Sequence, residues 1–366
     1  MSSVDLSIEV NGMLFENPFI LGSGPPGTNA RVISKSFNQG WGGCVIKTIS
    51  LDVSKVINTN PRYAKLKHDK EVIGFENIEL ISDRPFETWL EECREIKTNF
   101  PKKMLIASVM EEYSKGAWQE IIERVQETGV DGFELNLSCP HGLPERRMGM
   151  AMGSNPDIVH EVVDWVMEVA KIPVWAKMTP NVGDPTLSAK AALDAKADGI
   201  SLINTILSVI EVNLKTLRPM PTVEGHTVPG GYSGIAVRPI ALRHVMEVAK
   251  AFPQTKISGM GGIHTGYDAA QFMLMGSHTV QVCTGAMIQG YGVITKLIDE
   301  LTDFMTGHGF TRLEDFIGHS LDYFTTHADL VERQQEAKRT QAGKGNLDDR
   351  TWQGEIASET DSLTAN

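Results

Sequence analysis

The segment Glu134-Leu135-Asn136-Leu137-Ser138-Cys139-Pro140 brings an amide, a hydroxyl and a thiol to the end of an apolar run. The ordinary pKa of a cysteine thiol is about 8.5, so a thiol here can donate or accept a proton near neutral pH. Polar side chains at the end of a buried strand are typical of active sites in parallel barrels. The alternative is a structural cysteine in a turn, since free cysteine is among the most buried residue types. Residues 143–153 mix Glu and Arg with Gly and Met, which indicates a lid and favours a catalytic Cys139.

Eight apolar runs alternate with amphipathic stretches, and this alternation predicts an α/β fold, a (β/α)8 TIM barrel. The expected strands are residues 18–23, 44–49, 104–109, 132–137, 173–178, 199–205, 255–258 and 279–284. The expected helices include residues 117–128, 157–170, 187–195, 239–251 and 266–275. An open doubly wound sheet fits less well, because no G-x-G-x-x-G motif follows the first strand.

Both ends of the chain are expected to add to the barrel. Residues 6–10 and 13–15 flank Asn11-Gly12, a pair suited to a type I′ turn, which predicts an N-terminal β-hairpin that closes the bottom of the barrel. The barrel domain is expected to span residues 1–331. From Glu332 the chain is polar and without apolar periodicity, so residues 332–366 are expected to form an irregular tail, with Trp352 as a candidate anchor.

Composition excludes several classes of protein. The 366 residues carry a formal net charge of −12, which argues against a nucleic-acid partner. The apolar runs are too short to span a bilayer, and no secretory signal opens the chain, so no membrane association is expected. The four cysteines are scattered without a C-x-x-C pair, so no metal site or iron–sulfur cluster is predicted, and free thiols indicate a cytoplasmic location.

The ends of the predicted strands carry further candidates for chemistry. Lys47 and Lys177 end apolar strands, and a lysine in a barrel mouth is costly to bury unless an anion or an acceptor lies beside it. Gly261-Gly262 and Thr284-Gly285 follow the last two strands, where barrels commonly hold a phosphate on backbone N–H groups. Each glycine pair alone fits an ordinary turn equally well. Together with the lysines, the pattern indicates a flat phosphorylated cofactor.

Several motifs together resemble a known family. They are Asn-Leu-Ser-Cys-Pro-His-Gly from Asn136, with Glu145-Arg146 and Met148-Gly149; Ala-Lys-Met-Thr-Pro-Asn from Ala176; Tyr232-Ser233-Gly234 with Arg238-Pro239; and Gly-Phe-Glu-Asn-Ile-Glu from Gly74. Across residues 6–327 the chain resembles the FMN domain of dihydropyrimidine dehydrogenases, enzymes of pyrimidine metabolism whose barrel is similar to that of dihydroorotate dehydrogenases.

The resemblance implies FMN as cofactor and a reaction at the C5–C6 bond of uracil or thymine, or of their dihydro forms. The implied cofactor-binding residues are Gly22, Ser23, Lys47, Thr48, Asn136, Lys177, Asn204, Ser233, Gly234, Gly261, Gly262, Cys283 and Thr284. The implied substrate-binding residues are Asn77, Glu79, Asn136, Ser138, Asn204 and Thr205. It places Lys177 beside N1 and O2 of the flavin, and makes Cys139 the acid that protonates C5 while N5 of the flavin delivers hydride to C6.

The sequence departs from the family at one point. Bacterial members usually continue into a cysteine-rich, ferredoxin-like segment, whereas no cysteine follows Glu332 here. Electrons are therefore expected to come from a partner flavoprotein or ferredoxin in a homo- or hetero-oligomer, with slow reaction of the isolated chain with NADH or NADPH. The alternative is a small diffusible donor or acceptor that meets the flavin directly.

Three other functions remain open on the sequence. A dihydroorotate dehydrogenase shares the fold and the cysteine, but Glu79 would repel the carboxylate of orotate. A flavin-dependent tRNA dihydrouridine synthase is disfavoured by the acidic net charge. A non-catalytic flavin-binding subunit is disfavoured by the presence of Cys139 and the amide side chains.

Overall fold

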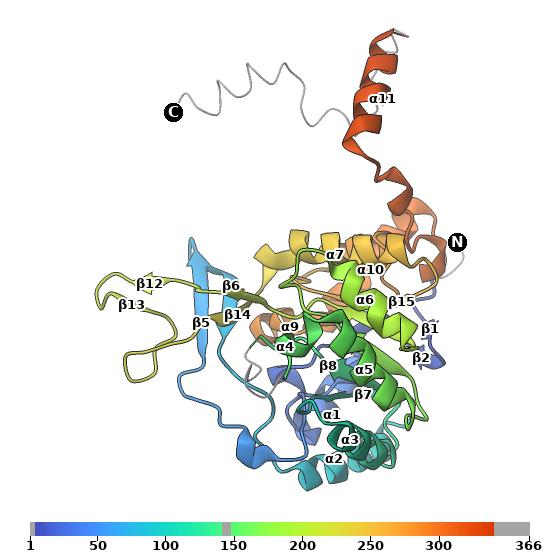
Figure 1. Ribbon diagram of the computed structural model, residues 1–366. Helices are drawn as coiled ribbons and strands as arrows, with labels where there is room; N and C mark the ends of the chain where they lie inside the picture. The colour runs from blue at the N-terminus through green and yellow to red at the C-terminus, as the bar shows by residue number, and fades with distance from the viewer. Residues whose placement is uncertain (1–3, 141–147, 340–366) are drawn as a thin grey trace. The chain divides into compact units, whose positions relative to one another are not determined.

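The fold is built on eight parallel strands that close into a barrel, as the sequence predicts. The computed structural model describes residues 4–140 and 148–339 (Figure 1). The barrel strands are β3 (Phe19–Leu21), β4 (Gly43–Val45), β7 (Met104–Val109), β8 (Gly132–Asn136), β9 (Val174–Lys177), β10 (Gly199–Leu202), β15 (Lys256–Met260) and β16 (Thr279–Val282). Their runs of apolar residues are buried on both faces, as expected for strands enclosed between a barrel interior and surrounding helices.

Helices connect the strands and cover the barrel (Figure 1). They are α1 (Ala30–Gln39), α2 (Phe86–Asn99), α3 (Lys115–Gln126), α4 (Met150–Gly153), α5 (Pro156–Met167), α6 (Pro185–Asp194), α7 (Arg238–Ala251), α8 (Gly266–Leu274), α9 (Thr284–Gln289) and α10 (Val293–His308). Several begin where a side chain caps the first turn: Asn29, Ser114, Asn155, Asp184 and Thr265 each accept a hydrogen bond from a backbone N–H. The five helices expected from the sequence correspond to α3, α5, α6, α7 and α8.

The N-terminal hairpin closes the amino-terminal end of the barrel, as predicted. Strands β1 (Ile8–Val10) and β2 (Met13–Phe15) pair through Asn11 and Gly12, whose φ values of 53° and 79° are those of a type I′ turn. The Asn11 side chain accepts from Trp175 Nε1 at 2.9 Å and donates to the carbonyl of Asp198 at 2.8 Å, which ties the turn to the strands that begin there. The alternate residues of both strands are buried and point into the barrel.

A second sheet, which the sequence did not predict, stands at the opposite end of the barrel. It is antiparallel, in the order β11 (Ile206–Ser208), β14 (Gly230–Ser233), β6 (Glu71–Asn77) and β5 (Tyr63–His68). Its strands come from the connections that follow β4 and β10, so it grows from the carboxyl ends of the barrel strands. The excursion between β11 and β14 carries the short pair β12 (Val212–Asn213) and β13 (Arg218–Pro219). Strands β11 and β14 have only three and four residues. Strands β5 and β6 have six and seven residues, but β5 alternates apolar and basic residues, and the apolar part of β6 is interrupted by Gly74 and bounded by glutamates, so neither shows a continuous apolar run.

The chain forms a separate unit from residue 322 onward, described here by itself. Its helix α11 (His327–Arg339) includes residues 332–339, so the irregular structure expected there is wrong for this stretch. The predicted domain boundary at residue 331 falls inside α11 and remains a prediction. Trp352 and residues 340–366 lie outside the described residues. Among the described helices, none has both the length and the apolar character that a membrane crossing requires.

The contacts of Asn11 generate a prediction about stability. Asn11→Ala removes both hydrogen bonds, leaves the buried Trp175 indole N–H without its acceptor and places alanine at positive φ, so we expect a loss of about 1–3 kcal/mol in the free energy of unfolding. Asn11→Gly keeps the turn conformation and should cost less. Glu9→Ala, on the exposed face of β1, is the matched control. Equal urea midpoints for Asn11→Ala and Glu9→Ala would contradict this role of the turn.

Candidate active site

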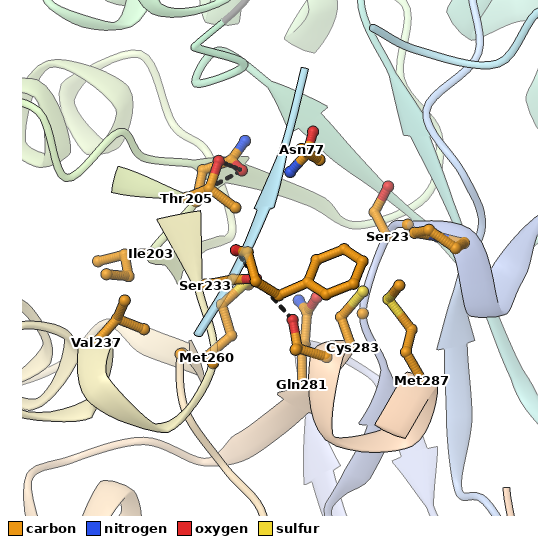
Figure 2. A pocket seen from close by; sticks show the side chains of 18 of the residues that line it. Ser23, Asn77, Ile203, Thr205, Ser233, Val237, Met260, Gln281, Cys283 and Met287 are labelled. Carbon is orange, nitrogen blue, oxygen red and sulfur yellow. Dashed lines mark hydrogen bonds between the residues drawn. The ribbon is translucent and has the colours of Figure 1, made fainter. Parts of the chain in front are cut away.

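A deep pocket lies at the carboxyl ends of the barrel strands, between the barrel mouth and the second sheet. Its empty volume of about 1090 Å³ includes space that is open to solvent. Figure 2 shows Asn77 and Thr205 on one side of the pocket and Gln281 and Cys283 on the other. Residues from distant parts of the sequence meet here because closure of the barrel brings all the strand ends to one rim.

The structure brings nearly all the predicted site residues into this one pocket. Its lining includes Gly22, Ser23, Lys47, Thr48, Asn77, Glu79, Asn136, Cys139, Lys177, Asn204, Thr205, Ser233, Gly234, Gly261, Gly262, Cys283 and Thr284. The exception is Ser138, which is fully buried and does not line the pocket. The residues selected by the family pattern therefore share one pocket, and their binding roles remain predictions.

Ser138 lies behind two amide side chains and holds them in place. Its hydroxyl donates to Asn136 Oδ1 at 3.1 Å and accepts from Asn204 Nδ2 at 2.9 Å. Asn136 Nδ2 in turn donates to Thr48 Oγ1 at 3.0 Å. These hydrogen bonds fix the orientations of the Asn136 and Asn204 amides beside the pocket.

A buried ion pair forms one wall of the pocket. Lys47 Nζ lies 2.6 Å from Glu79 Oε2, and the Tyr63 hydroxyl donates to the same oxygen at 2.7 Å. Arg62 Nε lies 3.4 Å from the other carboxylate oxygen. Burial, together with donation to Glu79, raises the pKa of Tyr63, which keeps the phenol protonated. The negative charge of Glu79 is therefore compensated, which weakens the expectation that it repels a substrate carboxylate.

A second buried ion pair lies in the barrel interior beneath the pocket. Lys177 Nζ lies 3.1 Å from Glu134 Oε1, and Gln281 Nε2 donates to Glu134 Oε2 at 2.7 Å. Glu134 is fully buried. Both lysines predicted to need an anionic partner therefore have one within the protein itself. Sequence reasoning missed Glu134, although a lone carboxylate within an apolar strand is a signal that it has a cation partner.

Glycines at positive φ shape one side of the pocket. Gly234, Gly261 and Gly262 have φ values of 106°, 128° and 76°. A Cβ added to Gly262 would come within 2.9 Å of the Gly234 carbonyl oxygen and 3.0 Å of the Arg238 backbone nitrogen, so a side chain does not fit. Beside them the Ser233 and Thr284 hydroxyls lie 2.8 Å apart. This cradle of backbone and hydroxyl groups has the chemistry of a phosphate site.

Cys139 lies at the pocket wall with only 6% of its surface exposed. It packs with Val56, Ile81 and Met148, and its carbonyl accepts from the backbone N–H of Met150 at 2.9 Å. The first turn of α4 therefore anchors the segment that follows β8. The predicted lid of residues 143–153 falls partly outside the described residues, which resume at Met148.

Cys283 is the other thiol of the pocket. Burial raises the pKa of Cys283 to about 11, although the ammonium groups of Lys177 and Lys47 partly offset the effect. The thiol is therefore neutral at physiological pH.

The second sheet supplies pocket residues that sequence reasoning did not assign. They are Tyr63, Phe75 and Tyr232, and the loop after β15 adds His264. Tyr232 lay within a quoted family motif, and it packs over Gly74, where an added Cβ would fall 2.0 Å from the phenol oxygen. The motif was a usable signal for Tyr232, whereas Tyr63 lies outside every motif.

Comparisons with known proteins identify the family of the chain. The family model described as dihydroorotate dehydrogenase matches residues 5–305. The chain is 53% identical over 379 aligned positions to a protein of Arabidopsis thaliana named dihydropyrimidine dehydrogenase (NADP(+)), chloroplastic, covering 100% of this chain and 89% of the relative. It is 40% identical over 322 positions to the NAD-dependent dihydropyrimidine dehydrogenase subunit PreA of Escherichia coli K12, covering 87% and 77% of the two chains.

A solved structure supports the fold. The crystal structure of a dihydroorotate dehydrogenase from Eimeria tenella in complex with ferulenol superposes with a TM-score of 0.73 at 20% identity, covering 86% of this chain and 88% of that one. At this identity the likeness shows the shared barrel alone, and it confirms the predicted fold class.

One prediction is overturned by these relatives. The cytoplasmic location expected from the scattered cysteines is wrong, because the Arabidopsis relative, identical at 53% of positions over the whole chain, is a chloroplastic protein. Free thiols indicate a reducing environment, but they do not identify the compartment that provides it.

The family and the class of enzyme expected from the motifs around Cys139 and Lys177 are both confirmed. The chain belongs to the dihydropyrimidine dehydrogenase family, oxidoreductases that act on CH–CH bonds within the wider dihydroorotate dehydrogenase family.

Proposed function

We propose that this chain is an FMN-dependent oxidoreductase that acts on the C5–C6 bond of uracil or thymine, or of their 5,6-dihydro forms. One observation carries the proposal. Cys139, three asparagine side chains and the Lys47–Glu79 pair face one pocket that also holds a glycine cradle. The names of the Arabidopsis and E. coli relatives, both dihydropyrimidine dehydrogenases, support the same substrate class.

The residues present fit FMN. Gly234, Gly261 and Gly262, with the hydroxyls of Ser233 and Thr284, would hold the phosphate. Small residues at the end of β3, Gly22 and Ser23, leave room for a flat ring system over the barrel mouth. When bound, FMN supplies the hydride-transfer chemistry that no side chain can provide.

The amide side chains bind and orient the pyrimidine. Uracil presents alternating N–H and C=O groups, and an amide offers two donors and two acceptor lone pairs. Asn77 donates to the Gly231 carbonyl at 3.2 Å, while Asn136 and Asn204 are held by Ser138, so all three side chains have fixed orientations. Glu79 adds an acceptor whose charge is already balanced by Lys47. A ring fixed in this way presents one face and one edge to the reacting groups.

Cys139 moves the proton. In the reducing direction its thiol gives a proton to C5 of the pyrimidine, and in the oxidising direction its thiolate removes that proton. The largely buried position of Cys139 among apolar side chains keeps bulk water away from the reacting carbon.

Electrons are proposed to reach the chain from a separate electron-transfer protein, with a nicotinamide as the ultimate donor. The E. coli relative is named as a subunit of an NAD-dependent enzyme, which supports a heteromeric arrangement. The Arabidopsis relative is named for NADP(+). The sequence carries no dinucleotide fingerprint and no cysteine beyond Cys283, so a relay within these residues has no ligands.

The proposal predicts the behaviour of the purified chain. It should bind one FMN, and dihydrouracil or dihydrothymine should reduce the bound flavin anaerobically far faster than dihydroorotate or NADPH does. The reason is that both named relatives are dihydropyrimidine dehydrogenases and that the pocket offers amide side chains to the pyrimidine edge. The measurement is stopped-flow absorbance of the flavin with each reductant.

Each part of that experiment has an outcome that would contradict the proposal. Failure to bind FMN would end the proposal. Faster reduction by dihydroorotate would identify a dihydroorotate dehydrogenase instead, and rapid reduction by NADPH alone would remove the need for a partner protein.

Replacing the thiol tests its role as the acid. Cys139→Ala should leave FMN and pyrimidine affinities intact but slow turnover by about 10²- to 10⁴-fold, the usual contribution of a positioned acid or base. The turnover rate of Cys139→Ser should lie between those of the wild type and Cys139→Ala, because a hydroxyl is a weaker acid than a thiol but similar in size. Steady-state rates with titrated binding affinities give the comparison.

The control is Cys93→Ala, which removes a thiol buried in α2 outside the pocket. Near-normal turnover of Cys139→Ala, or a loss of FMN binding equal to the loss of rate, would show that Cys139 is a structural residue.

A further inference from the structure

The floor of the pocket is polar where the interior of a barrel is usually apolar. Strands β7, β8, β9, β10, β15 and β16 contribute the buried polar side chains Ser108, Glu134, Lys177, Ser201, Ser258, Thr279 and Gln281. Branched apolar residues dominate such layers in other (β/α)8 barrels. Burying an ion pair in this position contributes little to stability, because apolar residues of similar volume often do as well or better. The polar layer therefore points to a role in the chemistry of the site.

Glu134 is the centre of this polar floor and is held at both oxygens. Oε1 lies 3.1 Å from Lys177 Nζ, and Oε2 accepts from Gln281 Nε2 at 2.7 Å. Gln281 Nε2 also lies 3.3 Å from Ser258 Oγ, which restricts the amide further. Glu134 itself is fully buried and does not line the pocket, whereas Lys177 and Gln281 do. Any effect of Glu134 on a ligand must therefore pass through these neighbours or through its charge.

The side-chain oxygen of Gln281 lies on the pocket side of the hydrogen bonds around Glu134. Within the described part of the chain, its buried Oε1 has no hydrogen-bond partner. That oxygen lies about 3.5 Å from the position that a Cβ on Gly22 would occupy, and Gly22 also lines the pocket. Because the amide nitrogen is committed to Glu134 and Ser258, the oxygen is directed to the floor of the pocket by the same bonds that hold the carboxylate.

We infer that Glu134 is a positioning residue that holds the Lys177 ammonium at the pocket floor and limits the positive charge available to a bound flavin. This inference rests on the proposed function, since it requires FMN in the pocket. A flavin gains negative charge on reduction, and a nearby ammonium stabilises that charge. The Lys177–Glu134 pair carries no net charge, so it stabilises the reduced flavin less than a lone lysine would. Glu134 thereby lowers the affinity for reduced FMN relative to oxidised FMN. The reduction potential of the bound flavin is therefore lower, and the reduced flavin is a stronger reductant, than it would be without the Glu134 charge.

The test compares the wild type with Glu134→Gln, which preserves the side-chain shape and removes the charge. We expect at least a tenfold rise in the affinity for reduced over oxidised FMN, equivalent to about 30 mV in the two-electron potential. The affinity for oxidised FMN should change much less. Fluorescence titration of the apoprotein gives the oxidised affinity, and anaerobic equilibration with a redox dye gives the potential, so neither readout depends on turnover.

Two further variants separate positioning from structural support. In a Lys177→Met background there is no ammonium to position and only the charge of Glu134 itself remains, so Glu134→Gln should shift the potential less than it does in the wild type. Asp131→Asn breaks a matched pair with Lys97, 2.7 Å apart near the amino-terminal ends of the strands, and should leave the potential unchanged. Equal shifts with and without Lys177, or a shift in Asp131→Asn as large as that in Glu134→Gln, would overturn the inference.

A variant that keeps the carboxylate covers the case in which Glu134→Gln fails to fold. Gln281→Leu removes the amide that offsets the charge of Glu134, so the potential should fall instead of rise. An unchanged potential in that variant would overturn the inference. Suppose that the wild-type protein binds FMN and reacts with dihydropyrimidine, but that the flavin potential in the Glu134 and Gln281 variants equals that in the wild type. This inference then fails and the proposed function stands. If the wild type binds no FMN, both fail.

Discussion

Closure of the parallel barrel is the constraint on which the site depends. Eight parallel strands that close on themselves must end on one rim, so residues as distant in sequence as Ser23 and Cys283 face one pocket. The closure is supported from the amino-terminal end, where Asn11 links the hairpin to Trp175 and to the carbonyl of Asp198. Every function argued for this chain requires the strand ends to stay in that register.

Charge compensation is the second organising feature. Two lysines at the ends of strands point toward the pocket, and each is paired with a glutamate, Lys47 with Glu79 and Lys177 with Glu134. A buried lysine without an anion would be costly, so the pairs let cationic groups stand in a water-poor site. The two pairs differ in depth: Glu79 lines the pocket and can meet a ligand, whereas Glu134 lies below it and acts through Lys177. The same pairing thus serves recognition in one place and electrostatic tuning in the other.

The second sheet completes the pocket and gives it a wall that a plain barrel lacks. Tyr63 and Tyr232 come from its strands, and Asn77 ends β6. Tyr63 shares its acceptor on Glu79 with Lys47, so the sheet and the barrel are joined through one carboxylate. This connection couples the placement of the sheet to the charge of the pocket wall.

The sequence alone determined the barrel, the hairpin and most of the site. Barrel strands are buried on both faces and read as continuous apolar runs, Asn11-Gly12 specifies its turn locally, and strand-end residues such as Asn136, Cys139 and Lys177 stand in recognisable motifs. These features depend on short-range patterns, which a single sequence displays directly.

Only the tertiary structure decided which of these residues meet. Ser138 was expected in the pocket but lies behind Asn136 and Asn204, because its hydroxyl is hydrogen-bonded to both amide side chains, one of which comes from a distant part of the chain. The second sheet and helix α11 were missed, since β5 alternates apolar and basic residues and α11 is a polar helix, so neither carries a continuous apolar run. The partners of Lys47 and Lys177 come from other strands or loops, so their pairing with Glu79 and Glu134 is a product of barrel closure, a long-range event that local sequence does not encode.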